Sequence, residues 1–410
     1  MPERLSAKFC QTRLLIISNK RNVITHVAII AFALLFLLIG NRIASQGMVI
    51  DYQDSSVLFA EARVIRIIDV HEEEISEWST HTIVTFSARI TSGEHKDKII
   101  AATQTRGGIY TSEPIEIQEG DRVLLAYGSM FTDEPARWYY EDHVRFNSII
   151  ALGVIFVILL LLFGKIKGLN AVFSLGFTCL AIFAVFIPSI LSGRNIYASA
   201  VLVCVFAIVV TLFMLNGINK KSFAAIAGCF GGVIAAGIIT LAMNSAMQLT
   251  GVTDSESIHL LNLPTASPVD LRAIIFAGII IGAVGAIMDV AVSISSALWE
   301  LKEQAPSLTF SELFKSGINI GKDIMGSMTN TLVLAYIGSS LTIILLLVVY
   351  SDSLTELFNR ELVIVEFLQA LVGSLGILLT TPLTALICAV LYSRKQGHIT
   401  SLRDIPGIEL

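Results

Sequence analysis

The sequence predicts an all-α polytopic membrane bundle of about eight transmembrane helices, with a small extracytoplasmic β-rich domain inserted after the first helix. Three observations lead to this prediction. Hydrophobic residues make up 54% of the 410 residues and charged residues only 15%, whereas soluble domains carry about 25% charged residues. Several apolar runs reach about 20 residues, the length that crosses ~30 Å of hydrocarbon. A polar stretch at 46–146 separates the first run from the others.

The apolar runs predict the helices in chain order. They lie near 23–40, 147–164, 169–191, 196–215, 223–247, 273–298, 327–350 and 362–392. The first run follows a long basic segment and no clean cleavage site comes after it, so we interpret 1–45 as a cytoplasmic tail with an uncleaved anchor helix. The remaining runs predict a seven-helix membrane domain over 147–393, followed by a second tail at 394–410.

Lysine and arginine residues predict the orientation of the bundle. With the N-terminus in the cytoplasm, the inside segments hold 15 basic residues and the short outside connections hold four. Basic residues favour the cytoplasmic side of short loops. We therefore expect both termini in the cytoplasm and the polar stretch outside it.

Residues 46–146 form a domain with a strand-like pattern. The stretch is acidic, with 18 Asp and Glu against nine Lys and Arg. Its runs alternate apolar and polar residues or are rich in β-branched residues, at 59–69, 81–90, 97–105 and 113–128. Several short strands of this spacing predict a small barrel, OB-like or similar.

An amphipathic segment precedes the seventh apolar run. The residues "PSLTFSELFKSGINIGKDIMGS" begin at Pro306 and carry apolar side chains at near-helical spacing. This pattern predicts a helix near 307–322 that lies along the cytoplasmic surface of the membrane.

Asp289 is the main candidate for a functional residue. It lies in the apolar run "GAVGAIMDVAVSISSALWEL" at 282–301, where a carboxylate at the centre of a membrane helix costs about 2.5–3.5 kcal/mol. The carboxylate must therefore face protein or a water-filled cavity. Ser293, four residues later, lies on the same helix face. We interpret Asp289 as a proton- or cation-accepting group; the alternative is a carboxyl that is only hydrogen-bonded to its neighbours.

Small residues and a polar cluster accompany Asp289. Gly278, Gly282 and Gly285 of the same run predict close helix packing. The next run opens with three further candidates for ion or proton coupling, Thr329, Asn330 and Thr331. Both groups fall in the inner half of the membrane, so we expect them to meet. Ordinary hydrogen bonding between helices is the alternative for the second group.

Motifs for catalysis or cofactors are not found. The sequence holds no Walker A loop, no Ser/His/Asp arrangement and no dinucleotide fingerprint. The five cysteines show no metal or disulfide spacing, and the acidic run 71–81 is interpreted as a solvated turn. We therefore expect no enzyme activity, no cofactor, no metal and no nucleic-acid partner.

Two stretches, "GAIMDVAVSISSALWEL" and "GKDIMGSMTNTLVLAYIGSSL", resemble the YibE/F-like family of bacterial membrane proteins. The resemblance extends over most of 120–393 and is most specific at 282–301 and 321–341. It implies a multi-pass protein of the bacterial cell membrane, and the anchor helix with an outer domain is similar to longer members.

A second resemblance concerns mechanism. The order of Gly285, Asp289 and Glu300, a cytoplasmic amphipathic segment, and then Thr329 and Thr331 is similar to SecD/SecF and RND-type exporter halves. The resemblance implies that Asp289 accepts a proton with Thr329 to Thr331 as neighbours, and that a second copy or a related shorter membrane subunit is the partner. The chain departs from that pattern in its helix count, its small outer domain and its lack of an intramembrane basic residue.

Two functions remain open from the sequence. The first is a proton- or cation-coupled transporter or export component of unassigned substrate. The second is a non-transporting membrane assembly or sensor protein, whose outer domain binds a ligand or partner and in which Asp289 is structural.

Overall fold

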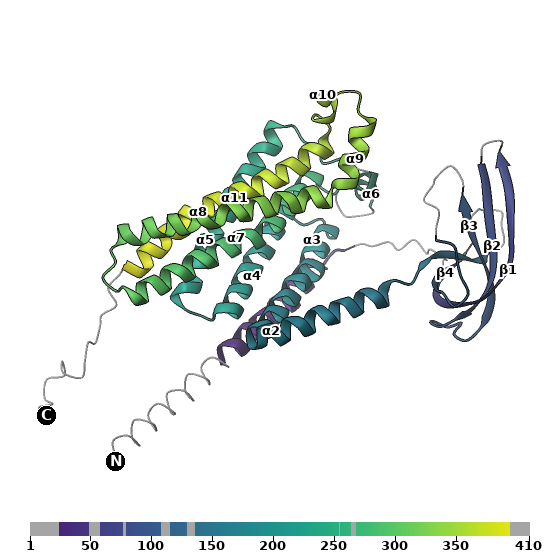
Figure 1. Ribbon diagram of the computed structural model, residues 1–410, viewed down its shortest axis with the longest axis horizontal. Helices are drawn as coiled ribbons and strands as arrows, with labels where there is room; N and C mark the ends of the chain where they lie inside the picture. Colours follow the sequence, from purple (N-terminus) through teal and green to yellow (C-terminus); the bar gives the residue numbers. More distant parts are fainter. Residues whose placement is uncertain are drawn as a thin grey trace, which may run out of the picture. The chain divides into compact units, whose positions relative to one another are not determined.

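The computed structural model describes residues 24–48, 58–76, 79–107, 115–128, 136–253, 255–263 and 268–393. Residues 1–23 of the predicted tail and anchor helix at 1–45, and the whole tail predicted at 394–410, lie outside these residues. The chain divides into two compact units, one formed by Met1–Ile50 with Phe163–Leu410 and the other by Asp51–Leu162. The first unit is helical and the second holds a β-barrel (Figure 1).

The barrel consists of five strands. They are β1 (Leu58–Ser76), β2 (Ser79–Ile90), β3 (Ile99–Gly107), β4 (Arg122–Gly128) and β5 (Arg137–His143). The sheet closes in the order β1-β2-β3-β5-β4, with β3 and β5 parallel and the other neighbouring pairs antiparallel. The small barrel predicted from the alternating pattern is confirmed.

The barrel core follows from that alternation. Successive residues of a strand point to opposite faces, and the inward positions are apolar. Phe86 and Ala88 of β2 and Val123 and Leu125 of β4 are fully buried. Closing the sheet leaves no free edge strand, which protects the short strands from pairing with other chains.

The other unit consists of helices. A first helix, Ile24–Ala44, belongs to it. The following helices are α2 (Phe146–Ala181), the π-helical turn η1 (Ile182–Phe186), α3 (Ile187–Leu191), α4 (Ile196–Asn216), α5 (Lys220–Ala246), α6 (Ser255–Leu261), α7 (Leu271–Gln304), α8 (Phe310–Ser339), α9 (Leu341–Tyr350), α10 (Leu354–Leu357) and α11 (Glu361–Ser393). The first residues of α2 fall in the other unit.

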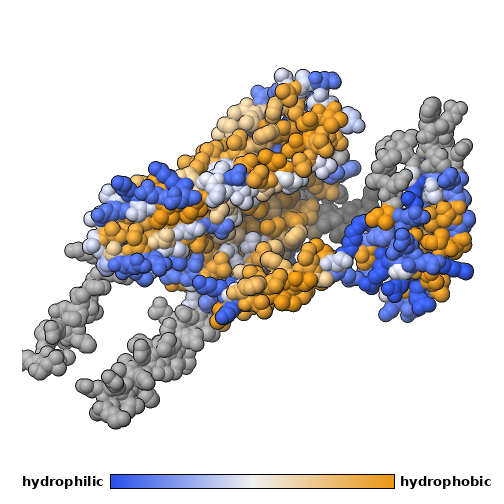
Figure 2. All heavy atoms as spheres, viewed as in Figure 1, coloured by the Kyte–Doolittle hydropathy of each residue, from blue (hydrophilic) through white to orange (hydrophobic). Residues whose placement is uncertain are grey.

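Within the described residues, six helical segments are long and apolar enough to cross a membrane, or seven if α8 and α9, bent by 63°, form one span. On the face shown in Figure 2, hydrophobic residues cover the sides of the long helices and hydrophilic residues gather toward their ends. This distribution is consistent with a membrane protein.

The runs predicted at 147–164 and 169–191 form two helical stretches of the 46-residue segment Phe146–Leu191, which meet at a kink. Lys165 interrupts it with non-helical angles, φ 49° and ψ −126°. At 1.5 Å per residue, 46 residues measure about 69 Å, roughly twice the hydrocarbon thickness. The connection predicted at this point is therefore a single strained residue rather than a loop.

The amphipathic helix predicted near 307–322 also differs from expectation. It continues without interruption through α8, and the chain bends only afterwards, at Ser340. A capping box between Thr309 and Glu312 begins the helix. Glycines inside it do not break it because Gly317 and Gly321 pack tightly against α11.

The helix α11 lies between α5, α7 and α8 in the packing of this unit. Its buried residues Thr380 and Thr384 lie over Gly232 and Gly228 of α5, where an added Cβ would overlap the threonine hydroxyls. From the other side, Gly321 of α8 lies against Thr381. The glycines of α5 are packing positions, because only glycine leaves room for these hydroxyls.

Candidate functional site

Asp289 lies near the middle of α7. Helix α7 begins at the N-cap Asp270, whose side chain accepts a hydrogen bond from the Ala273 amide. The Asp289 side chain is exposed and makes no hydrogen bond or ion pair with any described residue. The carboxylate therefore lies on an apolar helix without a partner from the rest of the described chain.

Glycines extend from Asp289 along the same helix face. Gly278, Gly282, Gly285 and Asp289 follow one another at helical spacing, and all four are exposed. A Cβ added to Gly278 or Gly285 would meet no atom within 4 Å. Of the three glycines predicted to pack, only Gly282 contacts another helix within the described residues, so the predicted close packing at Gly278 and Gly285 is not found in this chain.

Gly282 contacts a tyrosine that the sequence reasoning did not select. An added Cβ at Gly282 would lie 2.5 Å from the hydroxyl of Tyr336 on α8 and 3.6 Å from the amide nitrogen of Gln369 on α11. The Tyr336 hydroxyl is buried and has no hydrogen-bond partner of good geometry. A tyrosine in the middle of an apolar run was the available signal, because a buried phenol oxygen normally requires a partner.

The candidate residues of α8 are placed differently from one another. The Thr329 hydroxyl is buried without a hydrogen-bond partner, and the Thr331 hydroxyl donates to the Ser327 carbonyl at 2.8 Å. Asn330 is exposed. On α7, Ser293 is half-buried. No hydrogen bond joins any of the four predicted residues to Asp289 among the parts of the chain that the structure describes.

Helix geometry nevertheless places Thr329 level with Asp289. Helices α7 and α8 run antiparallel, since Gly282 contacts Tyr336 and Leu298 contacts Gly317. Asp289 is seven residues after Gly282, and Thr329 is seven residues before Tyr336. Seven residues make about two turns and return to the same face. The carboxylate and this hydroxyl therefore lie two turns along from the Gly282–Tyr336 contact.

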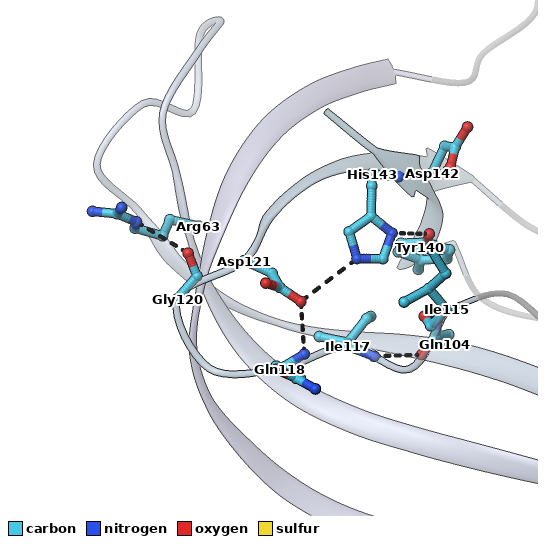
Figure 3. Close-up of polar contacts among 10 residues, drawn as sticks. All are labelled: Arg63, Gln104, Ile115, Ile117, Gln118, Gly120, Asp121, Tyr140, Asp142 and His143. Carbon is cyan, nitrogen blue, oxygen red and sulfur yellow. Dashed lines mark hydrogen bonds and ion pairs between the residues drawn. The ribbon is translucent and has the colours of Figure 1, made fainter. Parts of the chain in front are cut away.

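The barrel holds a second polar cluster, shown in Figure 3. The Tyr140 hydroxyl lies 2.6 Å from Nδ1 of His143, and Nε2 of His143 lies 3.5 Å from the Asp121 carboxylate. Asp121 also accepts a hydrogen bond of 2.8 Å from the Gln118 amide. The cluster joins the last strand of the barrel to the turn before β4.

Charges near this cluster change two pKa values. Burial, and then the nearby Asp142 carboxylate, raise the pKa of Tyr140. The backbone amide of His143 and the Arg145 guanidinium hydrogen-bond the Asp142 carboxylate and lower its pKa. No group of three or more metal-binding side chains occurs among the described residues. The acidic run 71–81, predicted as a solvated turn, instead belongs mostly to the paired strands β1 and β2, and most of its side chains lie outside the described residues.

Comparisons with known proteins address the part of the chain that carries Asp289. No curated protein and no solved structure is found to match. A family model described as YibE/F-like protein matches residues 152–394, which include α7, α8 and α11 and more than half of the chain. The chain belongs to the YibE/F-like family.

Proposed function

We propose that this protein is a proton- or cation-coupled membrane transporter or export component, and that Asp289 is the group that binds the coupling ion. The observation that carries the proposal is the exposed carboxylate on the glycine face of α7, which has no hydrogen-bond or ion-pair partner in the part of the chain that the structure describes. In lipid, such a group would cost about 2.5–3.5 kcal/mol or more. Water, a proton or a cation at Asp289 removes this cost, and a carboxyl that exchanges them is what coupling requires.

The proposal includes a membrane topology. The segment Phe146–Leu191 would cross the membrane twice and the α8–α9 pair once, which together with the other long helices gives about eight spans. The distribution of basic residues supports cytoplasmic termini and an extracytoplasmic barrel in a bacterial cell membrane. A second copy or a related shorter membrane subunit is the proposed partner. No enzyme activity is proposed.

Proton flux into proteoliposomes tests the role of Asp289. The full chain is reconstituted and proton uptake is driven by an imposed membrane potential and followed with an internal pH dye. We expect Asp289→Asn to abolish the flux, because an amide does not take up a proton in this pH range. Asp323→Asn is the matched control, since Asp323 of α8 is also an exposed carboxylate without a partner in the described chain. Wild-type flux in Asp289→Asn would refute the proposal.

A second candidate function is a membrane sensor or assembly protein whose barrel binds a ligand or partner. An aromatic group on the barrel favours it, where Trp138 lies 5.1 Å from Tyr127 and 6.2 Å from His95 between ring centroids. Half-buried aromatic rings of this kind are common in binding surfaces. Removal of the barrel would then abolish function in cells while Asp289→Asn would not, which is the reverse of the result expected for a transporter.

A further inference from the structure

We propose that the space between α7 and α8 is a hydrated pathway that leads to Asp289, lined by Tyr336 and Thr329 and beginning at Glu366 and Gln369 of α11. The inference rests on the proposed function, since it gives the route by which protons or water reach the coupling carboxylate. Tyr336 was not among the candidates selected from the sequence.

The first argument is the pair of buried hydroxyls on α8. Thr329 Oγ1 has no exposed area and no hydrogen-bond partner among the described residues. Tyr336 Oη is also buried and has no partner of good geometry there, although the Gln369 amide lies beside it. A buried polar atom without a partner costs about 1–3 kcal/mol, and ordered water is the usual partner where protein supplies none. The two residues are seven apart, so both hydroxyls lie on one face of α8.

The second argument is the space on the opposite helix. Between the Tyr336 contact and Asp289, the facing positions of α7 are Gly282, Gly285 and Ala286. An added Cβ at Gly285 would meet nothing within 4 Å. The Thr329 and Tyr336 hydroxyls therefore face a stretch of α7 that carries two glycines and one small apolar residue, and Gly285 leaves open space there.

The third argument is the polar group near Tyr336. Glu366 and Gln369 of α11 are half-buried and lie three residues apart, on one helix face. The Gln369 amide nitrogen approaches the same point above Gly282 as the Tyr336 hydroxyl, and Glu366 is within electrostatic range of that hydroxyl. A second carboxylate, an amide and a phenol thus converge two turns from Asp289.

The separation suits a short chain of water molecules. Gly282 and Asp289 are about 10.5 Å apart along α7 at 1.5 Å per residue. Water molecules about 2.8 Å apart would cover this distance in three or four steps. Polar groups stand at both ends of this distance, Gln369 and Tyr336 at one end and Thr329 and Asp289 at the other, and polar partners are what distinguish a wet site from a dry apolar gap.

Reaction of introduced cysteines with a water-soluble thiol reagent tests the pathway. Gly285→Cys and Thr329→Cys are made in the full chain with Cys10 and Cys179 replaced by serine; Cys204, Cys229 and Cys388 are buried. The reconstituted protein is treated with a membrane-impermeant methanethiosulfonate. Leu334→Cys is the control, because Leu334 of α8 is 59% exposed on a face that lipid would cover.

We expect Gly285→Cys and Thr329→Cys to react at least about tenfold faster than Leu334→Cys, since the reactive thiolate forms where water reaches it. Rates as slow as that of Leu334→Cys at both positions, in protein with a normal size-exclusion profile, would overturn the proposal. Lipid or a second copy covering this face would give that result. We also expect Tyr336→Phe to slow proton flux severalfold; unchanged flux would remove Tyr336 from the pathway.

The outcome is separable from that of the proposed function. If Asp289→Asn abolishes flux while both cysteines stay unreactive, the transporter proposal holds and the pathway is wrong. If the cysteines react while Asp289→Asn transports normally, the hydrated space exists but does not serve coupling at Asp289.

Discussion

The hydroxyl of Tyr336 on α8 lies against the backbone of Gly282 on α7, at a point where an added Cβ would be 2.5 Å from it. This contact ties two antiparallel helices together two turns from Asp289. The contact is possible because Gly282 has no side chain, and it places the buried Tyr336 oxygen against the glycine face of α7. Both the packing of α7 and the proposed path to Asp289 therefore depend on the same pair.

Gly282→Ala should destabilise the protein through this contact. A Cβ at 2.5 Å from oxygen requires Tyr336 to move, and overpacking of this kind costs about 1–3 kcal/mol. In the Tyr336→Phe background, the nearest ring atom would lie 3.6 Å away, an ordinary contact. We expect the melting temperature in detergent to fall by roughly 2–6 °C in the single variant and to recover in the double variant. Gly285→Ala, which meets open space, is the control.

Gly321→Ala should destabilise the contact between α8 and α11. Its methyl group would overlap the buried Thr381 side chain, whereas a methyl group at Gly326 of the same helix would meet nothing within 4 Å. Alanine is the better helix former by about 1 kcal/mol, so the two substitutions should have opposite signs. The melting temperatures of the two variants check this, and a loss of stability in Gly326→Ala equal to that in Gly321→Ala would contradict the packing described.

Tyr140→Phe should destabilise the barrel. The change removes the 2.6 Å contact between the hydroxyl and His143 while the ring stays in the core, and the loss of one hydrogen bond costs about 0.5–1.5 kcal/mol. The neighbouring Tyr139 makes no side-chain hydrogen bond with the described residues, so Tyr139→Phe should be neutral. Thermal unfolding of the full chain, followed by tryptophan fluorescence in a Trp299→Phe background, measures both variants. Equal effects at the two positions would argue against the cluster.

Asp142 should make the barrel sensitive to acid. The His143 backbone amide and the Arg145 guanidinium lower its pKa in the folded protein below its ordinary value of 3.8. A depressed folded pKa stabilises the protein at a pH above the unfolded pKa, and this contribution is lost as the pH falls through the folded pKa. We therefore expect a loss of stability below about pH 4 that is smaller in Asp142→Asn. Glu141→Gln, at an exposed neighbour, should leave the acid sensitivity unchanged when melting temperatures are compared between pH 3 and pH 6.

Helices and strands were largely predictable because their signals are local. Long apolar runs marked the helices, and alternation marked β2, β3 and β4. Two boundaries were not predictable in the same way. The break expected after residue 322 is absent, since α8 runs unbroken from Phe310 to Ser339 and packs along α11, and the loop expected near Lys165 is a single non-helical residue.

The candidate site was predictable in part. A carboxylate in an apolar run is conspicuous because a charged side chain costs free energy in lipid. Asp289 could therefore be selected from the sequence. Tyr336 and Gln369 matter because α8 and α11 pack beside α7. No local sequence pattern predicts which helices become neighbours. The sequence likewise did not distinguish the glycines that pack, such as Gly321, from those that face open space, such as Gly285.

The sequence by itself determined that this is an apolar helical protein with a small β-rich domain and an unusual carboxylate at position 289, because composition, periodicity and the cost of a buried charge are properties of single segments. The tertiary structure alone decided that α11 packs between α5, α7 and α8, that Asp289 has no partner among the described residues, and that the Tyr336 hydroxyl of α8 lies against Gly282 of α7. These are relations between segments far apart in the chain, set by which surfaces fit together.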